Sequence, residues 1–174
     1  MSKLANKTLQ YSVYDRTSGS AKYVEDTTKY KRPSIENLTD TLKGAGIMGE
    51  IDLPTLGQIG SMEIEITFNK TNAKAVALLS PETHTIEVRW VNDSFDSKTG
   101  GVSIESNKEI IKYMTKTFEN GEIESNSTNE ATLTGEVLTY QYILNGKSVV
   151  EIDKLNNVYK INGKDYTANI IKGL

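Results

Sequence analysis

The residues best suited to chemistry are four carboxylates in the first half of the chain. Glu50 and Asp52 lie in one segment that alternates polar and apolar residues, and Glu63 and Glu65 lie in the next. Neighbouring carboxylates can act as a general acid and base, or can hold calcium together with other oxygen ligands. The glycine and terminal glutamate of an EF-hand loop are absent from this stretch. We therefore interpret the four carboxylates as a solvated acidic face and predict no catalytic or metal site there.

The other candidates for chemistry are isolated. His84 is the only histidine, whereas a hydrolase needs a nucleophile, a base and an orienting group together, and zinc needs several His or Cys ligands. The oxygen-rich residues 92–96 do not follow a calcium-loop pattern. The glycines of residues 44–49 precede a strand instead of opening a helix, so they are not a dinucleotide fingerprint. The sequence predicts a protein that is not an enzyme and binds no cofactor or metal.

Length and charge restrict the remaining classes. The chain has 174 residues and a formal net charge of −3, which suits a single domain and disfavours a nucleic-acid binder that works through phosphate contacts. It has no cysteine, so it forms no disulfide and offers no thiolate metal site. No apolar run is long enough for a membrane span, and residues 1–10 lack the apolar region of a secretory signal, so we expect assembly in a cytoplasm.

The elements that carry the carboxylates occupy residues 43–68. Residues 47–53 and 61–68 alternate with a period of two, which is typical of half-buried strands. Pro54, Gly57 and Gly60 punctuate the link between them, and we expect the two strands to form one hairpin. The apolar face of the second strand is predicted to be core, and its residues are Met62, Ile64, Ile66 and Phe68.

The flanking segments supply a hairpin and helices. Residues 9–26 are predicted to form an N-terminal hairpin. Residues 34–43 place apolar side chains at helical spacing, which indicates a short helix before Gly44. Residues 72–79 are the best helix in the chain, because alanine and leucine favour helix and a proline ends it.

The remaining strands are predicted within residues 83–168. Residues 92–101 are expected to form a loop, and a bulge is expected near Gly135 in a strand too long to stay flat. Hairpin turns are indicated by Asn-Gly pairs, at Asn120-Gly121, Asn145-Gly146 and Asn162-Gly163. The first of these strands, residues 83–91, turns three side chains to the core, which are Ile86, Val88 and Trp90.

These elements predict a mainly β fold, with residues 1–174 as one domain: a two-sheet antiparallel β-sandwich or barrel with one flanking α-helix. Such an open sheet has edges that invite pairing with another chain. A closed ring of copies would pair those edges and turn the acidic row toward a shared interior.

Two blocks of sequence resemble a known family. They are IENLTDTLKGAGIMGEIDLPTLGQIGSMEIEITF at residues 35–68 and YILNGKSVVEIDKLNNVYKINGKDYTANIIKGL at residues 142–174. In these blocks the chain resembles the major tail tube proteins of contractile-tailed phages and of phage-tail-like (R-type) bacteriocins, the FII-like family. The second block is the more distinctive, with its NGK turn, EID and second NG turn. Residues 92–129 match only as strand and loop, and nothing is carried over there.

The resemblance implies a structural role. In that family six copies form a ring through a shared inter-subunit β-barrel that lines the lumen, and rings stack into a hollow tube. A tail sheath drives the tube through the target envelope, a tape-measure protein sets its length, and baseplate and tail-terminator proteins close its ends. In a phage, DNA passes through the lumen. The protein is therefore expected in a virion or bacteriocin particle that is assembled in the bacterial host cytoplasm.

The resemblance also assigns residues to surfaces. Those expected to face the lumen are Glu50, Asp52, Ser61, Glu63, Glu65 and Thr67. Those expected at ring-stacking or inter-subunit contacts are Pro54, Thr55, Leu56, Gly57, Gln58, Ile59, Leu9, Tyr11 and Val13.

Two alternatives stay open. One is the tube protein of a type VI-like secretion system, and the other, from a different class, is a β-sandwich carbohydrate-binding module. The latter needs an exposed aromatic platform, whereas Trp90 and the nine tyrosines are expected in the core or at interfaces.

Overall fold

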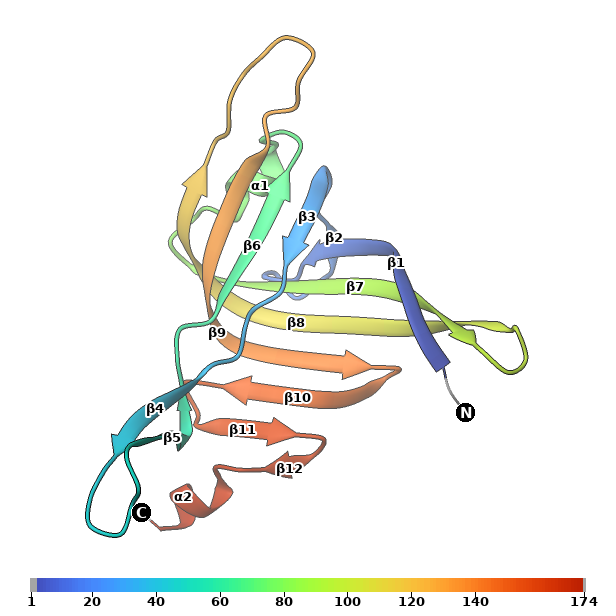
Figure 1. Ribbon diagram of the computed structural model, residues 1–174. Coiled ribbons are helices and arrows are strands. Elements are labelled where there is room, and N and C mark those ends of the chain that lie inside the picture. The colour runs from blue at the N-terminus through green and yellow to red at the C-terminus, as the bar shows by residue number, and fades with distance from the viewer. Residues whose placement is uncertain (1–2, 174) are drawn as a thin grey trace.

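The computed structural model describes residues 3–173 and shows an antiparallel β-sandwich with two projecting arms (Figure 1). Ten strands form one branched sheet and two form a separate ribbon. The strands are β1 (Lys3–Asp15), β2 (Lys22–Tyr23), β3 (Thr27–Lys31), β4 (Asn37–Leu42), β5 (Ile51–Ile59), β6 (Glu63–Phe68), β7 (Thr83–Asp96), β8 (Val102–Glu119), β9 (Ala131–Leu144), β10 (Lys147–Asp153), β11 (Val158–Ile161) and β12 (Lys164–Asp165). The helices are α1 (Ala73–Ala77) and α2 (Ala168–Lys172). The mainly β fold class with a flanking helix is confirmed.

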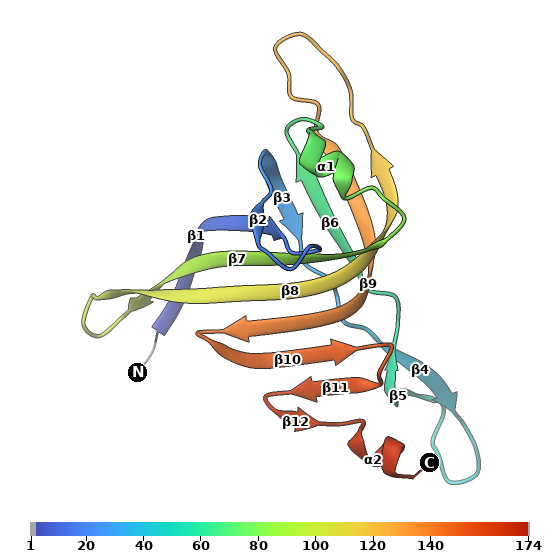
Figure 2. The ribbon, with the colours of Figure 1, turned by 180° about the vertical axis from the view of Figure 1, so that it is seen from behind.

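The branched sheet folds into two layers. The first follows the order β12-β11-β10-β9-β8-β7-β1-β2, and the second consists of β3 and β6, with β6 also paired to β9. β9 belongs to both layers, because residues 131–136 pair with β6 and residues 139–144 pair with β10. Seen from the front and from behind, β3 and β6 cross the strands of the first layer (Figures 1 and 2).

β8 and β9 bend where they pass between the layers. A register shift separates Thr115 from Thr117, and Gly135 lies opposite Thr115. A Cβ atom on Gly135 would lie 2.3 Å from Cδ2 of Tyr113, so the tyrosine ring occupies the space of the missing side chain. The irregularity predicted near Gly135 is confirmed, although the additional residue, Lys116, lies on β8.

The core lies between the two layers and is built by alternation. Every second residue of β6 is fully buried. In the middle of β7, Ile86 and Val88 face the core, and Glu87 between them is also fully buried, in ion pairs with two arginines. Trp90, expected in the core, is half-buried and packs against it. The fully buried apolar side chains include Val13, Met62, Ile64, Ile66, Phe68, Ile86, Ile111, Tyr113 and Leu133.

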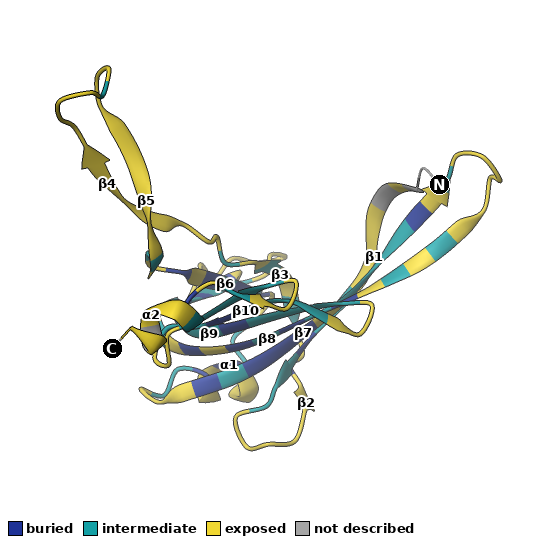
Figure 3. Ribbon diagram, turned by 90° about the horizontal axis from the view of Figure 1, so that it is seen from below, coloured by how far each residue is buried: buried dark blue, intermediate teal, exposed yellow. Residues whose placement is uncertain are grey.

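Two ribbons project from the sandwich: one is almost wholly exposed, and the other mixes exposed and half-buried residues (Figure 3). The β4–β5 arm is the separate ribbon formed by β4 and β5. The β7–β8 arm consists of the paired ends of β7 and β8, and the start of β1 adds a third strand through Leu4 opposite Phe95. α2 lies beside the root of the β4–β5 arm in both Figure 1 and Figure 2.

Turn chemistry explains several connections. Asn145 and Asn162 and the glycines that follow them all have positive φ, as type I′ hairpin turns require. Both predicted turns are therefore confirmed. The third pair, Asn120-Gly121, does not make a tight hairpin, because the connection between β8 and β9 spans residues 120–130.

The two helices are short. Asn72 caps α1 by accepting a hydrogen bond from the backbone nitrogen of Ala75 at 2.9 Å, so the predicted helix exists in shortened form. α2 follows the last strand and was not predicted.

Local expectations fail in the arms. Residues 34–43 were expected to be helical, but β4 occupies most of them, because β5 supplies backbone partners and no surface covers a helical stripe. Residues 92–101 were expected to form a loop, but β7 continues to Asp96. The two segments of residues 43–68 do not pair with each other: β5 pairs with β4, and β6 pairs with β3 and β9. The expected link at residues 54–60 is mostly the end of β5.

Candidate assembly surfaces

The β4–β5 arm has an apolar face with nothing over it. Leu42 lies opposite Ile51 and Asp40 lies opposite Leu53, so these side chains share one side of the ribbon together with Leu38. The four apolar members are each 46–50% exposed. A two-stranded ribbon is marginally stable alone, so burial of this apolar face would stabilise the arm.

The opposite face of the same arm is polar. Thr41 Oγ1 donates to Asp52 Oδ1 at 2.6 Å. Near the tip, Lys43 Nζ donates to Glu50 Oε1 at 3.0 Å. Glu50 and Asp52 therefore lie on a different sheet from the carboxylates of β6, and the single acidic row expected from the sequence is two separate patches.

The root of the arm packs on its own chain. Gly57 has φ +74°, and a Cβ atom there would lie 2.9 Å from Thr167 and 3.2 Å from Ile170 of the C-terminal segment. Ile59 packs against the core. Of the residues in this stretch that were expected at contacts between subunits, those exposed in the free chain are Pro54, Thr55, Leu56 and Gln58.

A cluster around the fully buried Glu109 holds the chain just before it leaves the body for this arm. Arg32 Nε donates to Glu109 Oε1 at 2.6 Å, and Glu109 is fully buried. The guanidinium also lies 4.8 Å from the ring centroid of Trp90 and 4.7 Å from that of Tyr142, within cation–π range of both. Trp90 is therefore covered by a charged side chain of its own chain and does not offer an open aromatic platform.

Two tyrosines complete this cluster. Tyr140 donates to Glu109 at 2.6 Å and Tyr30 donates to it at 2.9 Å. Burial and the adjacent Glu109 carboxylate raise the pKa of both phenols well above their ordinary value. Glu109 is thus satisfied by one cation and two hydroxyl groups, which is the condition for keeping a carboxylate in the interior.

The outer face of β6 is charged but paired. Lys31 Nζ donates to Glu65 Oε1 at 2.6 Å, and Lys116 forms an ion pair with Glu63. The positions of β6 and its approach that were expected to face the lumen are all exposed or half-exposed on this outer face, and they are Ser61, Glu63, Glu65 and Thr67. This face therefore consists of ion pairs and hydroxyl groups, and not of a row of unpaired carboxylates.

The β7–β8 arm also has an apolar face, which we call the apolar strip. It consists of Leu4, Phe95, Val102 and Ile104, which the strand register places on one side. Their side chains are 41–69% exposed. The other side of this arm is polar and contains a hydrogen bond of 2.7 Å between the hydroxyl groups of two serines, Ser94 and Ser103.

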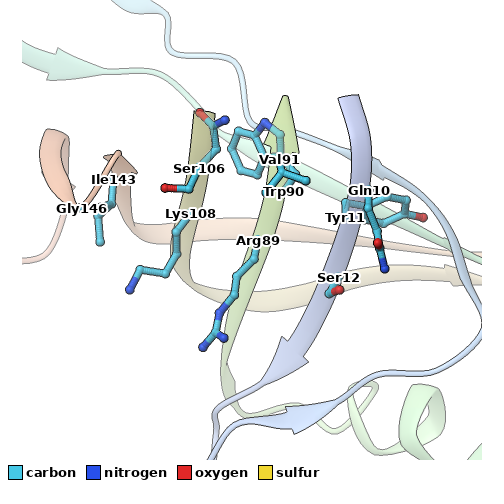
Figure 4. Close-up of a pocket in the computed structure, with 11 residues that line it drawn as sticks. Gln10, Tyr11, Ser12, Arg89, Trp90, Val91, Ser106, Lys108, Ile143 and Gly146 are labelled. Carbon is cyan, nitrogen blue, oxygen red and sulfur yellow. The ribbon is translucent and has the colours of Figure 1, made fainter. Parts of the chain in front are cut away.

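The strip continues toward the body into a hollow of about 660 Å³ on the same face of the sheet (Figure 4). Arg89 and Lys108 extend side by side from neighbouring strands there. Arg89 pairs with the fully buried Glu87, which also accepts from Arg16 at 2.6 Å. Since one carboxylate serves two arginines and Lys108 adds a further cation, this end of the strip is electropositive.

The N-terminal strand was expected to contact neighbouring subunits, and its three candidates differ. Leu9 is 54% exposed and available. Tyr11 is half-buried and its hydroxyl donates to the backbone oxygen of Thr27 at 3.0 Å. Val13 lies opposite Val88 and is fully buried, so it belongs to the core of its own chain and not to a contact surface.

The residues considered for catalysis have structural roles. His84 is buried, with Nε2 at 3.0 Å from the backbone oxygen of Ser80 and its ring beside Tyr113. Within residues 3–173, no group of three or more His, Cys, Asp or Glu side chains could hold a metal ion. No helix of this described part has the length and apolar character needed to cross a membrane.

Comparison with known families indicates a role in assembly. The family described as phage tail tube protein FII matches residues 17–174. The chain belongs to this phage tail tube family. Its role is therefore structural: it is a virion component that assembles with copies of itself into a tail tube. A search of curated proteins found no match.

Sequence reasoning missed two features of this tube subunit. The cluster around Glu109 joins residues up to 108 positions apart, as between Arg32 and Tyr140, and no local pattern reveals such a contact. The apolar strip did leave a signal, because Val102 and Ile104 alternate with polar residues. Phe95, which lies opposite Val102, was not recognised as part of the strip because residues 92–101 were expected to form a loop.

Proposed function

We propose that six copies of this chain form a ring and that the rings stack into the hollow inner tube of a contractile injection apparatus. Family membership supports the tube, and the resemblance of the two sequence blocks supports the contractile branch. The observation that carries the proposal is the pair of arms: two ribbons leave the body with apolar faces uncovered, as expected of a subunit that is completed only by its neighbours.

Stacked rings need contacts of the head-to-tail kind. A head-to-tail interface joins two different surfaces, and a filament results when the rotation does not close. The chain offers two different apolar surfaces, on the β4–β5 arm and on the β7–β8 arm. The exposed residues Pro54, Thr55 and Leu56 on the former remain our candidates for contact with an adjacent ring.

We propose that the outer face of β6 lines the lumen, with Ser61, Glu63, Glu65 and Thr67 toward the bore. The lysines nearest to Glu63 and Glu65 are already engaged by these carboxylates, so a passing phosphate would have to compete with an existing ion pair. In a phage such a wall would let DNA pass without binding it. Glu50 and Asp52 lie on the arm and would reach the lumen only if the arm tip does.

The remaining partners follow from the same proposal. A tail sheath surrounds the tube, a tape-measure protein sets its length, and baseplate and tail-terminator proteins cap it. An R-type bacteriocin would use the same subunit without DNA.

Negative-stain electron microscopy of the purified protein tests the proposal. We expect hollow tubes or rings with six-fold symmetry in end-on averages. A protein that stays monomeric at high concentration, or that forms rings of another symmetry, would contradict it.

The lumen assignment has its own test, because the chain contains no cysteine. We expect Glu63→Cys in assembled tubes to react with a small maleimide and to be protected from a maleimide attached to a protein too large for the bore. Dissociated subunits serve as the control and should react with both. Equal reaction of the bulky reagent with tubes and subunits would place Glu63 outside.

A further inference from the structure

The two apolar surfaces of the chain are similar in form. Each is one side of a β-ribbon and carries four large apolar side chains, which are 46–50% exposed on the arm and 41–69% exposed on the strip. Figure 3 shows the two arms leaving the body at separate places and diverging. The strip is therefore not covered by the β4–β5 arm of the same chain, and a β4–β5 arm that covers it would have to come from another copy.

The two surfaces differ in charge. Residues 36–59, which include the β4–β5 arm, contain four carboxylates and one lysine. Their net charge of −3 equals that of the whole chain, so the remainder is formally neutral. Asp40 stands among the apolar residues of the arm, opposite Leu53. The apolar strip instead ends at Arg89 and Lys108.

We propose that the apolar face of the β4–β5 arm docks on the apolar strip of a neighbouring copy, with Asp40 directed toward Arg89 and Lys108. This rests on the proposed assembly into a tube and names the two surfaces that meet in it. Burial of two half-exposed apolar faces supplies the attraction, and the charges select the partner and its direction.

The charges also disfavour the symmetric alternatives. Two arms packed face to face would bring Asp40 against Asp40 of the partner, and two strips would bring together their arginine and lysine ends. Such isologous pairs would also close into dimers, whereas arm on strip repeats without closing. One carboxylate lies beside the strip on the same face: Asp93, opposite Ile104, accepts a hydrogen bond from the backbone nitrogen of Lys7 at 2.7 Å.

Cysteine cross-linking tests the contact. A mixture of Leu53→Cys and Ile104→Cys proteins, assembled and then oxidised, is expected to give a disulfide-linked dimer that contains one chain of each kind. Thr41→Cys is the matched control, because Thr41 lies on the same arm but on its polar face, and its mixture with Ile104→Cys should give at least about tenfold less mixed dimer. Equal cross-linking from both faces, or tubes without the Leu53–Ile104 product, would overturn the proposed contact.

Charge reversal tests its direction. Asp40→Lys and Lys108→Glu should each raise the protein concentration needed for assembly about tenfold or more, and the double variant should recover most of that loss. Circular dichroism of each variant as a monomer checks that it is folded. Additive defects in the double variant would contradict the pairing.

The same experiments separate this inference from the function on which it rests. If wild-type protein forms tubes but the cross-link and the rescue both fail, the tube stands and the arm-on-strip contact is wrong. If wild-type protein forms no tubes or rings, the proposed function fails, and the contact fails with it.

Discussion

β6 and the β4–β5 arm both alternate apolar and acidic residues, but the apolar side chains of β6 are buried and those of the arm are exposed. Ile64 and Ile66 alternate with glutamates and are fully buried. Ile51 and Leu53 alternate with an aspartate and are 46–47% exposed. The difference is the first layer of the sandwich, which covers the apolar face of β6 and does not extend to the arm.

The comparison separates what a period of two specifies from what it leaves open. Alternation gives a strand with two unlike faces, and both regions are strands with two unlike faces. What covers the apolar face depends on other parts of the chain or on other chains. For β6 the cover is internal, and for the arm we propose that it is a neighbouring copy.

The largest expected effect comes from a matched pair of truncations in the two regions. Ile66→Ala should lower the free energy of unfolding of the monomer by about 4 kcal/mol, because it leaves a cavity between two packed layers. Leu53→Ala should change it by less than about 0.5 kcal/mol, yet should weaken assembly. Urea titration measures the first quantity and sedimentation the second. A large loss of monomer stability in Leu53→Ala would mean that the arm is covered within its own chain.

A smaller effect is expected at the junction of body and arm. Arg32→Ala should cost about 3 kcal/mol, because the fully buried Glu109 loses its cation. The adjacent Lys31→Ala, which removes an exposed ion pair with Glu65, should cost at most about 1 kcal/mol. Thermal unfolding compares the two variants. Similar losses would show that Glu109 is adequately satisfied by its tyrosines alone.

The interior of the body contains one polar atom whose removal should stabilise it. The Tyr113 hydroxyl is buried and has no hydrogen-bond partner among the described residues. Tyr113→Phe should therefore raise the free energy of unfolding by about 1 kcal/mol. Tyr140→Phe, which loses a donor to Glu109, should lower it by about 1 kcal/mol. Chemical denaturation would reveal both signs, and destabilisation by Tyr113→Phe would imply a bound water at that hydroxyl.

The smallest effect is a dependence on acid at the junction of β5 and β6. Burial favours the neutral form of Glu136, but hydrogen bonds from Ser61, Lys154 and the backbone of Met62 outweigh it and hold the pKa of Glu136 below its ordinary value of 4.5. Because the folded pKa is depressed, the contribution to stability is present above pH 4.5 and is lost as the pH falls through the folded value.

Glu136→Gln should therefore be less stable than the parent at pH 7, by less than about 1 kcal/mol, and the gap should close in acid. Urea titrations at several values between pH 7 and pH 3 measure it. A gap that is constant across this range would show that the ion pair and hydrogen bonds of Glu136 do not depend on its charge.

The strands of the body were largely predictable from sequence, because their apolar faces are buried in the same chain that encodes them. β6, the first part of β7 and the turns at Asn145 and Asn162 follow from local pattern alone. The pairing partners of β5 and β6 could not be predicted in this way, because Pro54 suggested a turn that would join the two strands into one hairpin.

The proposed contact surfaces were less accessible to sequence reasoning. Leu38 and Leu42 fit a helical stripe as well as a strand, and only pairing with β5 decides between them. The four carboxylates suggested one acidic row, but Glu63 and Glu65 are paired with lysines of other strands, Lys116 and Lys31. Such partners become visible only when the register between strands is known.

The spacing of the cluster around Glu109 bears on the order of events during folding. Arg32 and Tyr140 lie 108 residues apart, and a sandwich that depends on such remote pairings typically folds in milliseconds to seconds. The β4–β5 arm closes within a short stretch of chain, and isolated hairpins form in about 1–10 μs. The β7–β8 hairpin closes as locally, but the strip is complete only when β1 pairs with β7 and brings Leu4 opposite Phe95. A newly made subunit would therefore form its arm before its strip is complete, so the rate of polymerisation at high concentration should be limited by completion of the strip and not by encounter.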